Sequence, residues 1–295
     1  MIPMMASVTA AVENPVTPTQ RKPHASKVIE SENIFQLMQQ QALPELIHSM
    51  TQEKNIKRLL ITSTAGDIHD HRANPYLVKA YEETNEEGVR CKLLQSMGQF
   101  HDPALFTWFV RRLKNPSIGI QCFAIWALGE LRTPKAVEPL RRKLRSSNRN
   151  VQMTAIDALG KTGKNAELAS ELGTFLADDD AQIRFIVAQA LRGTAGVDMA
   201  PEIMKRLMDE PSLDVQEALA GTLGHVGGMI AAEHFIELLK NPPTQATEHW
   251  AELGLAAGDA DIVIPVLTPL LNSGDLSVRL SATRLLKGFG KNVEP

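Results

Sequence analysis

Five segments of the chain decide the fold: VRCKLLQSMG (89–98), IQCFAIWALG (120–129), VQMTAIDALG (151–160), IRFIVAQALR (183–192) and VQEALAGTLG (215–224). Their tenth positions follow one another in steps of 31, 31, 32 and 32 residues. The same period extends backward to Gly66 and forward to Gly254 and Lys287. Eight segments in register indicate an internal repeat, and a repeat of this length is typical of solenoid proteins.

Each unit has the pattern of two helices. The first carries apolar residues at helical spacing, such as Ile120, Ala124 and Leu128, and ends near the repeated glycine, which suits a helix terminus. The second begins with a capping residue and a proline, as in Asp102-Pro103 and Thr133-Pro134. The sequence therefore predicts an all-α protein, an α-solenoid of about eight two-helix repeats.

The repeated positions resemble the HEAT-like repeats of the phycobilisome-lyase type, a family of bacterial and eukaryotic helical scaffolds. The resemblance is carried by a polar turn, then Val or Ile followed by Arg or Gln, then Ala-Leu-Gly. The Arg/Gln column comprises Arg58, Arg90, Gln121, Gln152, Arg184, Gln216 and Arg279. The resemblance implies a HEAT-like solenoid over residues 53–295, in which this column tethers one repeat's turn to the next. It says little about function, because the family spans lyase subunits, adaptors and scaffolds.

The two ends of the chain differ from the repeats. Residues 1–26 hold four prolines and few large apolar groups, and we expect a disordered tail there. Residues 27–52 are expected to form short helices that cap the first repeat, since a solenoid end otherwise exposes its core. The last unit is expected to stop after one helix at Gly290 and to act as the opposite cap.

The overall composition excludes several classes of protein. No apolar run is long enough to span a membrane, and the first residues lack the basic region of a secretory signal. The two cysteines, Cys91 and Cys122, have no zinc-ligand spacing, which favours a reducing compartment. They share a repeat position with Met153 and Phe185, so we expect core packing there. A cytoplasmic protein without a cofactor is the expectation.

Charge is distributed unevenly along the repeats. Residues 111–149 contain ten Lys/Arg and two Glu, whereas residues 165–261 contain five Lys/Arg and seventeen Asp/Glu. Second helices of such repeats usually line the concave face, which is the common binding surface. Seven cations, called the basic ladder below, are expected there: Lys79, Arg111, Lys114, Lys135, Arg142, Arg145 and Lys205.

The basic ladder suggests a non-catalytic adaptor or scaffold. We expect it to bind a protein partner, with an acidic segment or surface, in the concave groove. A charged helix face can equally serve solubility alone, so this partner site is a hypothesis. Nucleic acid is an alternative ligand, as in HEAT-like DNA-repair proteins, because clustered Lys/Arg neutralise phosphates. Few aromatic residues near the ladder and the acidic later repeats argue against that ligand.

A lyase-type or metal-dependent enzyme subunit is the third class of function. His69, His71 and His101 are weak metal candidates, because His69 and His101 lie one period apart and should be neighbours on one rim. Adjacent repeats are separated by about a helix diameter, roughly 10 Å, so these ligands would converge only through bent loops. No catalytic residue is predicted.

Overall fold

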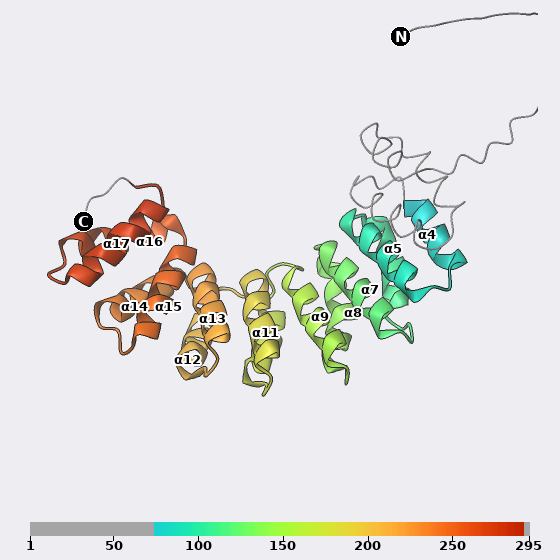
Figure 1. Ribbon diagram of the computed structural model, residues 1–295, viewed down its shortest axis with the longest axis horizontal. Helices are drawn as coiled ribbons and strands as arrows, with labels where there is room; N and C mark the ends of the chain where they lie inside the picture. The colour runs from blue at the N-terminus through green and yellow to red at the C-terminus, as the bar shows by residue number, and fades with distance from the viewer. Residues whose placement is uncertain (1–73, 292–295) are drawn as a thin grey trace, which may run out of the picture.

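The fold is that of a computed structural model. The structure describes residues 74–291, except for the side chain of Tyr76. Over this range the chain forms α-helices and short 3-10 turns and has no strand. The helices succeed one another along an arc (Figure 1). The predicted all-α solenoid is confirmed. The predicted tail at 1–26, the predicted cap at 27–52 and the repeat ending at Gly66 lie outside the described residues.

The helices form two layers. The inner layer contains the repeated segments: α5 (Glu87–Gln99), α7 (Ile118–Glu130), α9 (Arg149–Gly160), α11 (Ala181–Thr194), α13 (Leu213–Val226), α15 (Gln245–Ala257) and α17 (Leu276–Gly288). The outer layer contains α4 (Asn74–Glu83), α6 (Phe106–Arg112), α8 (Val137–Arg141), α10 (Ala166–Gly173), α12 (Ala200–Asp209), α14 (Gly228–Lys240) and α16 (Ala260–Leu267). Each outer helix packs against the inner helix that follows it in the chain.

Seven complete hairpins therefore occupy the described residues, from α4–α5 to α16–α17. The hairpin begins one helix earlier than the sequence pattern suggests, because the glycine-ending helix is its second helix and not its first. The expectation of a lone helix at the C-terminal end is also wrong, since α17 completes a hairpin with α16. The rule that second helices line the concave face applies once the hairpin is divided correctly.

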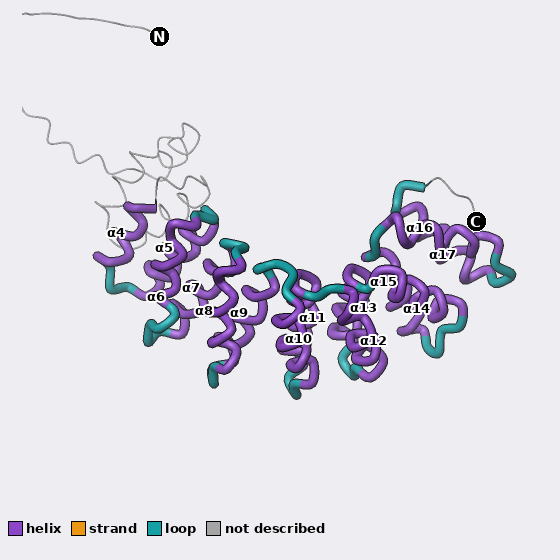
Figure 2. The backbone as a smooth tube through the Cα atoms, turned by 180° about the vertical axis from the view of Figure 1, so that it is seen from behind, coloured by secondary structure: helices purple, strands orange, loops and turns teal. Residues whose placement is uncertain are grey.

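Inner helices from α5 to α15 pack on one another more extensively than the outer helices do. Closer packing on one side bends the stack toward that side, so the inner layer from α5 to α15 lies on the concave face. In both views α12 lies on the outer side of the arc from α13, and Figure 2 shows the same for α10 and α11. The expectation that the proline-starting helices line the concave face is therefore wrong.

The repeated glycine permits this close packing. A Cβ on Gly129 would lie 2.8 Å from the Cα of Ala158, and a Cβ on Gly160 would lie 2.7 Å from the Cα of Ala190. Both glycines have ordinary right-handed helical backbone. Their role is thus the approach of neighbouring inner helices, and not the helix termination that the sequence suggested.

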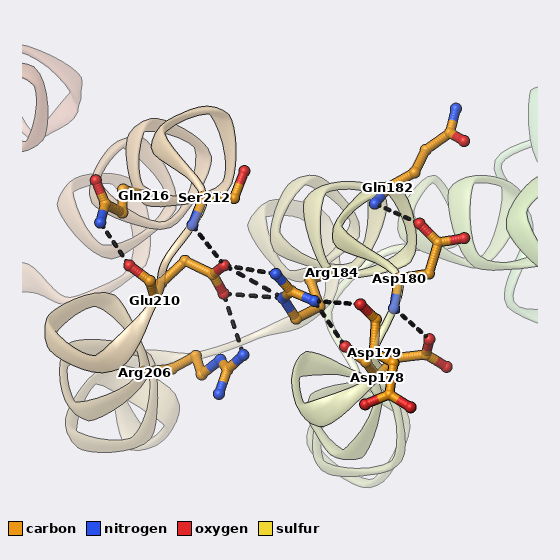
Figure 3. Close-up of polar contacts among 9 residues, drawn as sticks. All are labelled: Asp178, Asp179, Asp180, Gln182, Arg184, Arg206, Glu210, Ser212 and Gln216. Atoms are coloured by element: carbon orange, nitrogen blue, oxygen red, sulfur yellow. Dashed lines mark hydrogen bonds and ion pairs between the residues drawn. The ribbon is translucent and has the colours of Figure 1, made fainter.

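Polar side chains at the turns cap helices and hold the turns in place, both between hairpins and within them. Asp102 and Thr133 accept hydrogen bonds from the backbone N–H of Ala104 and Lys135, which confirms them as helix caps. In the Arg/Gln column, Gln152 donates to the carbonyl of Leu144 at 2.9 Å. Gln121 and Arg279 likewise donate to carbonyls of the turn before their own helix. The column therefore mainly secures turns within a repeat, and the expected link to the next repeat occurs at Arg184 (Figure 3).

A left-handed residue follows three successive inner helices, and it offers a test of backbone strain. His101 (φ 51°), Arg132 (φ 46°) and Gly163 (φ 98°) lie 31 residues apart. We expect Arg132→Gly to raise the free energy of unfolding by about 0.5 kcal/mol, since relief of strain exceeds the added entropy of the unfolded glycine. Urea denaturation measures the change. Lys164→Gly, at a loop residue without positive φ, should lower stability, and a loss in Arg132→Gly as well would contradict the assignment.

Candidate partner-binding surfaces

An open groove of about 670 Å³ crosses the inner layer between α11, α13 and α15. Its apolar lining includes Phe185, Ala218 and Leu253, one from each of the three helices. Phe185, Ala218 and Leu253 are each only half-buried, although they pack against the core. The groove thus presents apolar surface on the concave side of three successive repeats, where an extended chain would contact each repeat in turn.

Polar side chains border the groove. Gln182, Gln189 and Arg192 come from α11, and Asp214 and Glu217 come from α13. The Glu217 carboxylate lies 3.3 Å from Nε2 of His249 on α15. Both side chains are about half exposed, so this contact contributes little to stability. The two carboxylates outnumber the one guanidinium, and the border favours a ligand with positive charge.

Gly221 leaves the groove open in its middle. It lies within α13 and lines the groove, and a Cβ added there would meet nothing within 4 Å. Its backbone is ordinary helix. A larger side chain at this position would therefore fill the groove without disturbing the packing of the inner helices. This contrasts with Gly129 and Gly160, which face neighbouring helices.

Phe185 lines the groove, although its repeat position predicts a place in the core. It occupies the third position of its repeated segment, with Cys91, Cys122 and Met153, and the structure places all four half-buried on the inner layer. The equivalent residue in α13 is the exposed Glu217. That carboxylate, in a column that is apolar elsewhere except for Thr247, was the available signal that the column reaches the surface.

The cysteine thiols have the environment of packed apolar groups. Cys91 and Cys122 are free and half-buried. Burial raises the pKa of the Cys91 thiol, and the nearby Glu87 and Cys122 raise it further. A reactive thiol needs a lowered pKa, so this environment opposes nucleophilic chemistry at Cys91.

The basic ladder belongs to the outer layer and its turns, away from the groove. All seven of its side chains are exposed. Lys79 pairs with Glu83, but the side chains of the other six form no hydrogen bond or ion pair with any residue in 74–291. Neighbouring cations behave differently, since Arg141 pairs with Glu171 at 2.7 Å and Lys143 donates to the carbonyl of Leu113. The predicted place of the ladder in the concave groove is wrong, while its role in partner binding stays a prediction.

Of the three histidine candidates for a metal site, only His101 lies within the described residues. His101 follows α5, and its ring Nδ1 lies 2.6 Å from the carbonyl oxygen of Glu130, which ends the next inner helix. His69 and His71 lie outside the described residues. Between residues 74 and 291, no three His, Cys, Asp or Glu side chains are placed to hold a metal ion. None of the helices described there is long and apolar enough to cross a membrane.

Comparison with known proteins bears on the repeats and the fold. The profile of HEAT repeats matches residues 106–192, which run from α6 to α11. No curated protein sequence matches the chain. One chain in the structure of the CpcE–CpcF complex of phycocyanin lyase from Nostoc sp. PCC7120 is similar at 14% identity and a TM-score of 0.51, covering 92% of this chain and 99% of that one. An engineered protein is similar at 17% identity and a TM-score of 0.50, covering 89% of this chain and 82% of that one.

Likeness at such identities shows the fold alone, so the lyase structure adds nothing to the enzymatic alternative. The repeat pattern, the two-layer stack and the profile match agree on one architecture. The chain is an α-solenoid of HEAT-like repeats, a fold that commonly mediates protein binding.

Proposed function

We propose that the protein is a non-catalytic adaptor that holds an extended segment of a protein partner in its inner groove. The observation that carries this proposal is the open groove of about 670 Å³, in which apolar side chains of three successive repeats reach the concave surface. Exposed apolar surface of this kind in a water-soluble fold marks an interaction site. The adaptor would act in the cytoplasm, where free cysteines such as Cys91 and Cys122 persist.

The chemistry of the groove defines the segment that fits it. Phe185 and Leu253 suit a bulky apolar side chain, while Asp214 and Glu217 on the border suit a flanking Lys or Arg. The surrounding stretch, residues 165–261, also carries an excess of acidic residues. The groove ligand is therefore an apolar segment with basic flanks, in place of the acidic segment first expected there. An acidic surface of a partner fits the basic ladder on the outer layer.

Blocking the groove at Gly221 tests this function. Peptides selected for binding from a random display library should be enriched in a bulky apolar residue next to Lys or Arg. Gly221→Leu should weaken their binding about a hundredfold, because the new side chain occupies the groove. Fluorescence anisotropy of a labelled selected peptide gives the affinity. The substitution should leave stability unchanged or slightly higher, since leucine favours helix over glycine.

Gly88→Leu provides the matched control. Gly88 lies in the inner helix α5, outside the groove, and a Cβ there also meets nothing within 4 Å. Gly88→Leu should therefore leave the affinity for the selected peptide unchanged. Equal binding by wild type and Gly221→Leu, or selection of acidic peptides, would overturn the proposed groove ligand.

A further inference from the structure

A second pocket, of about 380 Å³, lies where α4, α5 and α6 meet the turn at residues 113–116. Its charged lining comprises Arg90, Arg111, Arg112, Lys114 and Glu82. Four cations therefore face one carboxylate, which leaves three positive charges around one small space. Arg111 and Lys114 are the ladder residues in this pocket, so the pocket stands at the N-terminal part of the basic ladder.

Arg90 and Arg112 are fixed by contacts with neighbouring groups. The Arg112 guanidinium lies 3.6 Å from the centre of the Trp108 ring, donates to the Trp108 carbonyl and pairs with Glu82. Arg90 donates to the carbonyl of Tyr81 and to the side chain of Asn85. These contacts hold two guanidinium groups in place before any ligand arrives, which lowers the entropy cost of binding.

Tyr81 adds an uncharged polar group to the pocket. The residue is 3% exposed, and its hydroxyl, which lies beside the Arg112 guanidinium, donates no hydrogen bond among residues 74–291. The guanidinium carbons of Arg90 and Arg112 both lie 5.2 Å from the centre of its ring. Burial raises the pKa of Tyr81 despite these two cations, so the hydroxyl keeps its proton and remains a hydrogen-bond donor.

Arg111 and Lys114 complete the pocket with charges that the fold itself does not use. Both are exposed, and neither side chain forms a hydrogen bond or ion pair with another residue in 74–291. A rigid pair of guanidinium groups with two free cations at the border is the arrangement that recognises a multiply charged anion. A single carboxylate would neutralise one of the three net positive charges of the pocket. A phosphate monoester carries nearly two negative charges and would neutralise more of them.

We propose that this pocket binds the phosphate group of a phosphorylated side chain on a protein partner. Arg90 and Arg112 would hold the phosphate oxygens, Tyr81 would donate a hydrogen bond, and Arg111 and Lys114 would close over the ligand. This inference concerns the ladder and does not depend on the inner groove. It gives a recognition role to two of the ladder cations whose side chains have no partner within residues 74–291.

A short phosphoserine peptide with neutral flanks is the probe for this site. Isothermal titration should show that wild type binds it and does not bind the unphosphorylated peptide. Arg111→Gln combined with Lys114→Gln should weaken binding about tenfold or more, because two charge-assisted contacts are lost. Lys135→Gln combined with Lys205→Gln is the control, since these ladder cations are exposed and lie outside the pocket. The control should bind like wild type.

A gain of affinity tests the same site in the opposite direction. Glu82→Gln removes the one carboxylate of the pocket and frees Arg112 from its ion pair, so phosphopeptide binding should tighten several-fold. Gly221→Leu should leave it unchanged, which separates this site from the groove. Failure of wild type to distinguish the two peptides, or an equal loss in the control, would overturn the proposal. A single-stranded DNA oligonucleotide that binds more tightly than the phosphopeptide would assign the ladder to nucleic acid instead.

Discussion

Leu128→Asp is expected to unfold the stack around α7. Leu128 is 0% exposed and lies among apolar residues of the inner layer. The substitution removes this apolar contact and places a carboxylate among buried apolar side chains. Leucine-to-alanine changes in cores already cost about 2–5 kcal/mol, and the buried charge adds to that cost. Because domains are stable by about 5–15 kcal/mol, most or all of the stability of this region should be lost.

Ile118→Asp on the same helix is the matched control for Leu128→Asp. Ile118 is the first residue of α7 and is 37% exposed, and a carboxylate there interacts favourably with the helix N-terminus. Circular dichroism during thermal unfolding measures both variants. Leu128→Asp should lose most of its free energy of unfolding, whereas Ile118→Asp should lose less than about 1 kcal/mol. A cooperative, wild-type-like transition in Leu128→Asp would contradict the packing of the inner layer described here.

Glu210→Gln is expected to cost about 3–5 kcal/mol at neutral pH, because it breaks a buried ion pair between two repeats. The Glu210 side chain is 0% exposed, and Arg184 of the preceding repeat donates to it at 2.8 Å. Arg206 and the backbone N–H of Ser212 also donate to its carboxylate (Figure 3). Loss of the negative charge leaves the buried Arg184 guanidinium and the partly exposed Arg206 guanidinium without their counter-ion.

The same network makes stability depend on pH. Burial alone would raise the pKa of Glu210, but the hydrogen bonds from Arg184 and Ser212 and the charges of Arg184 and Arg206 outweigh it and lower the pKa. A carboxyl group with a lowered folded-state pKa contributes stability above its unfolded pKa, near 4.5. That contribution is lost as pH falls from this value through the lower folded-state pKa. The stability difference between wild type and Glu210→Gln should therefore shrink in acid.

Urea denaturation at neutral pH and below pH 4.5 measures this difference. Hydrogen exchange shows where the stability is lost. The amides of α11 and α13 should lose protection first in Glu210→Gln, because the contact between Arg184 and Glu210 joins these two helices. Glu138→Gln is the control, because its ion pair with Arg141 is exposed on the Glu138 side and should contribute less than about 1 kcal/mol. A pH-independent difference between wild type and Glu210→Gln would show that the charge of Glu210 is not what stabilises the contact.

The sequence predicted the parts of the structure that depend on local pattern. The period of 31 or 32 residues identified the helices, the turns and most of the core, since equivalent positions in a stack share one environment. It also identified Asp102 and Thr133 as caps, because capping depends on residues within a turn or two. The uneven charge, with cations in 111–149 and carboxylates in 165–261, is likewise a property of the sequence itself.

The candidate sites depended on distances between helices, which the period does not contain. A repeat can be divided before either of its helices, and only the packing of α6 on α7 or α12 on α13 decides the hairpin. That choice placed the basic ladder outside and Phe185 inside the arc. Similarly, an apolar column can be buried or open to a groove, and the curvature of the stack determines which. The sequence by itself determined the repeated unit, whereas the tertiary structure decided which face each unit presents, because curvature arises from contacts between repeats.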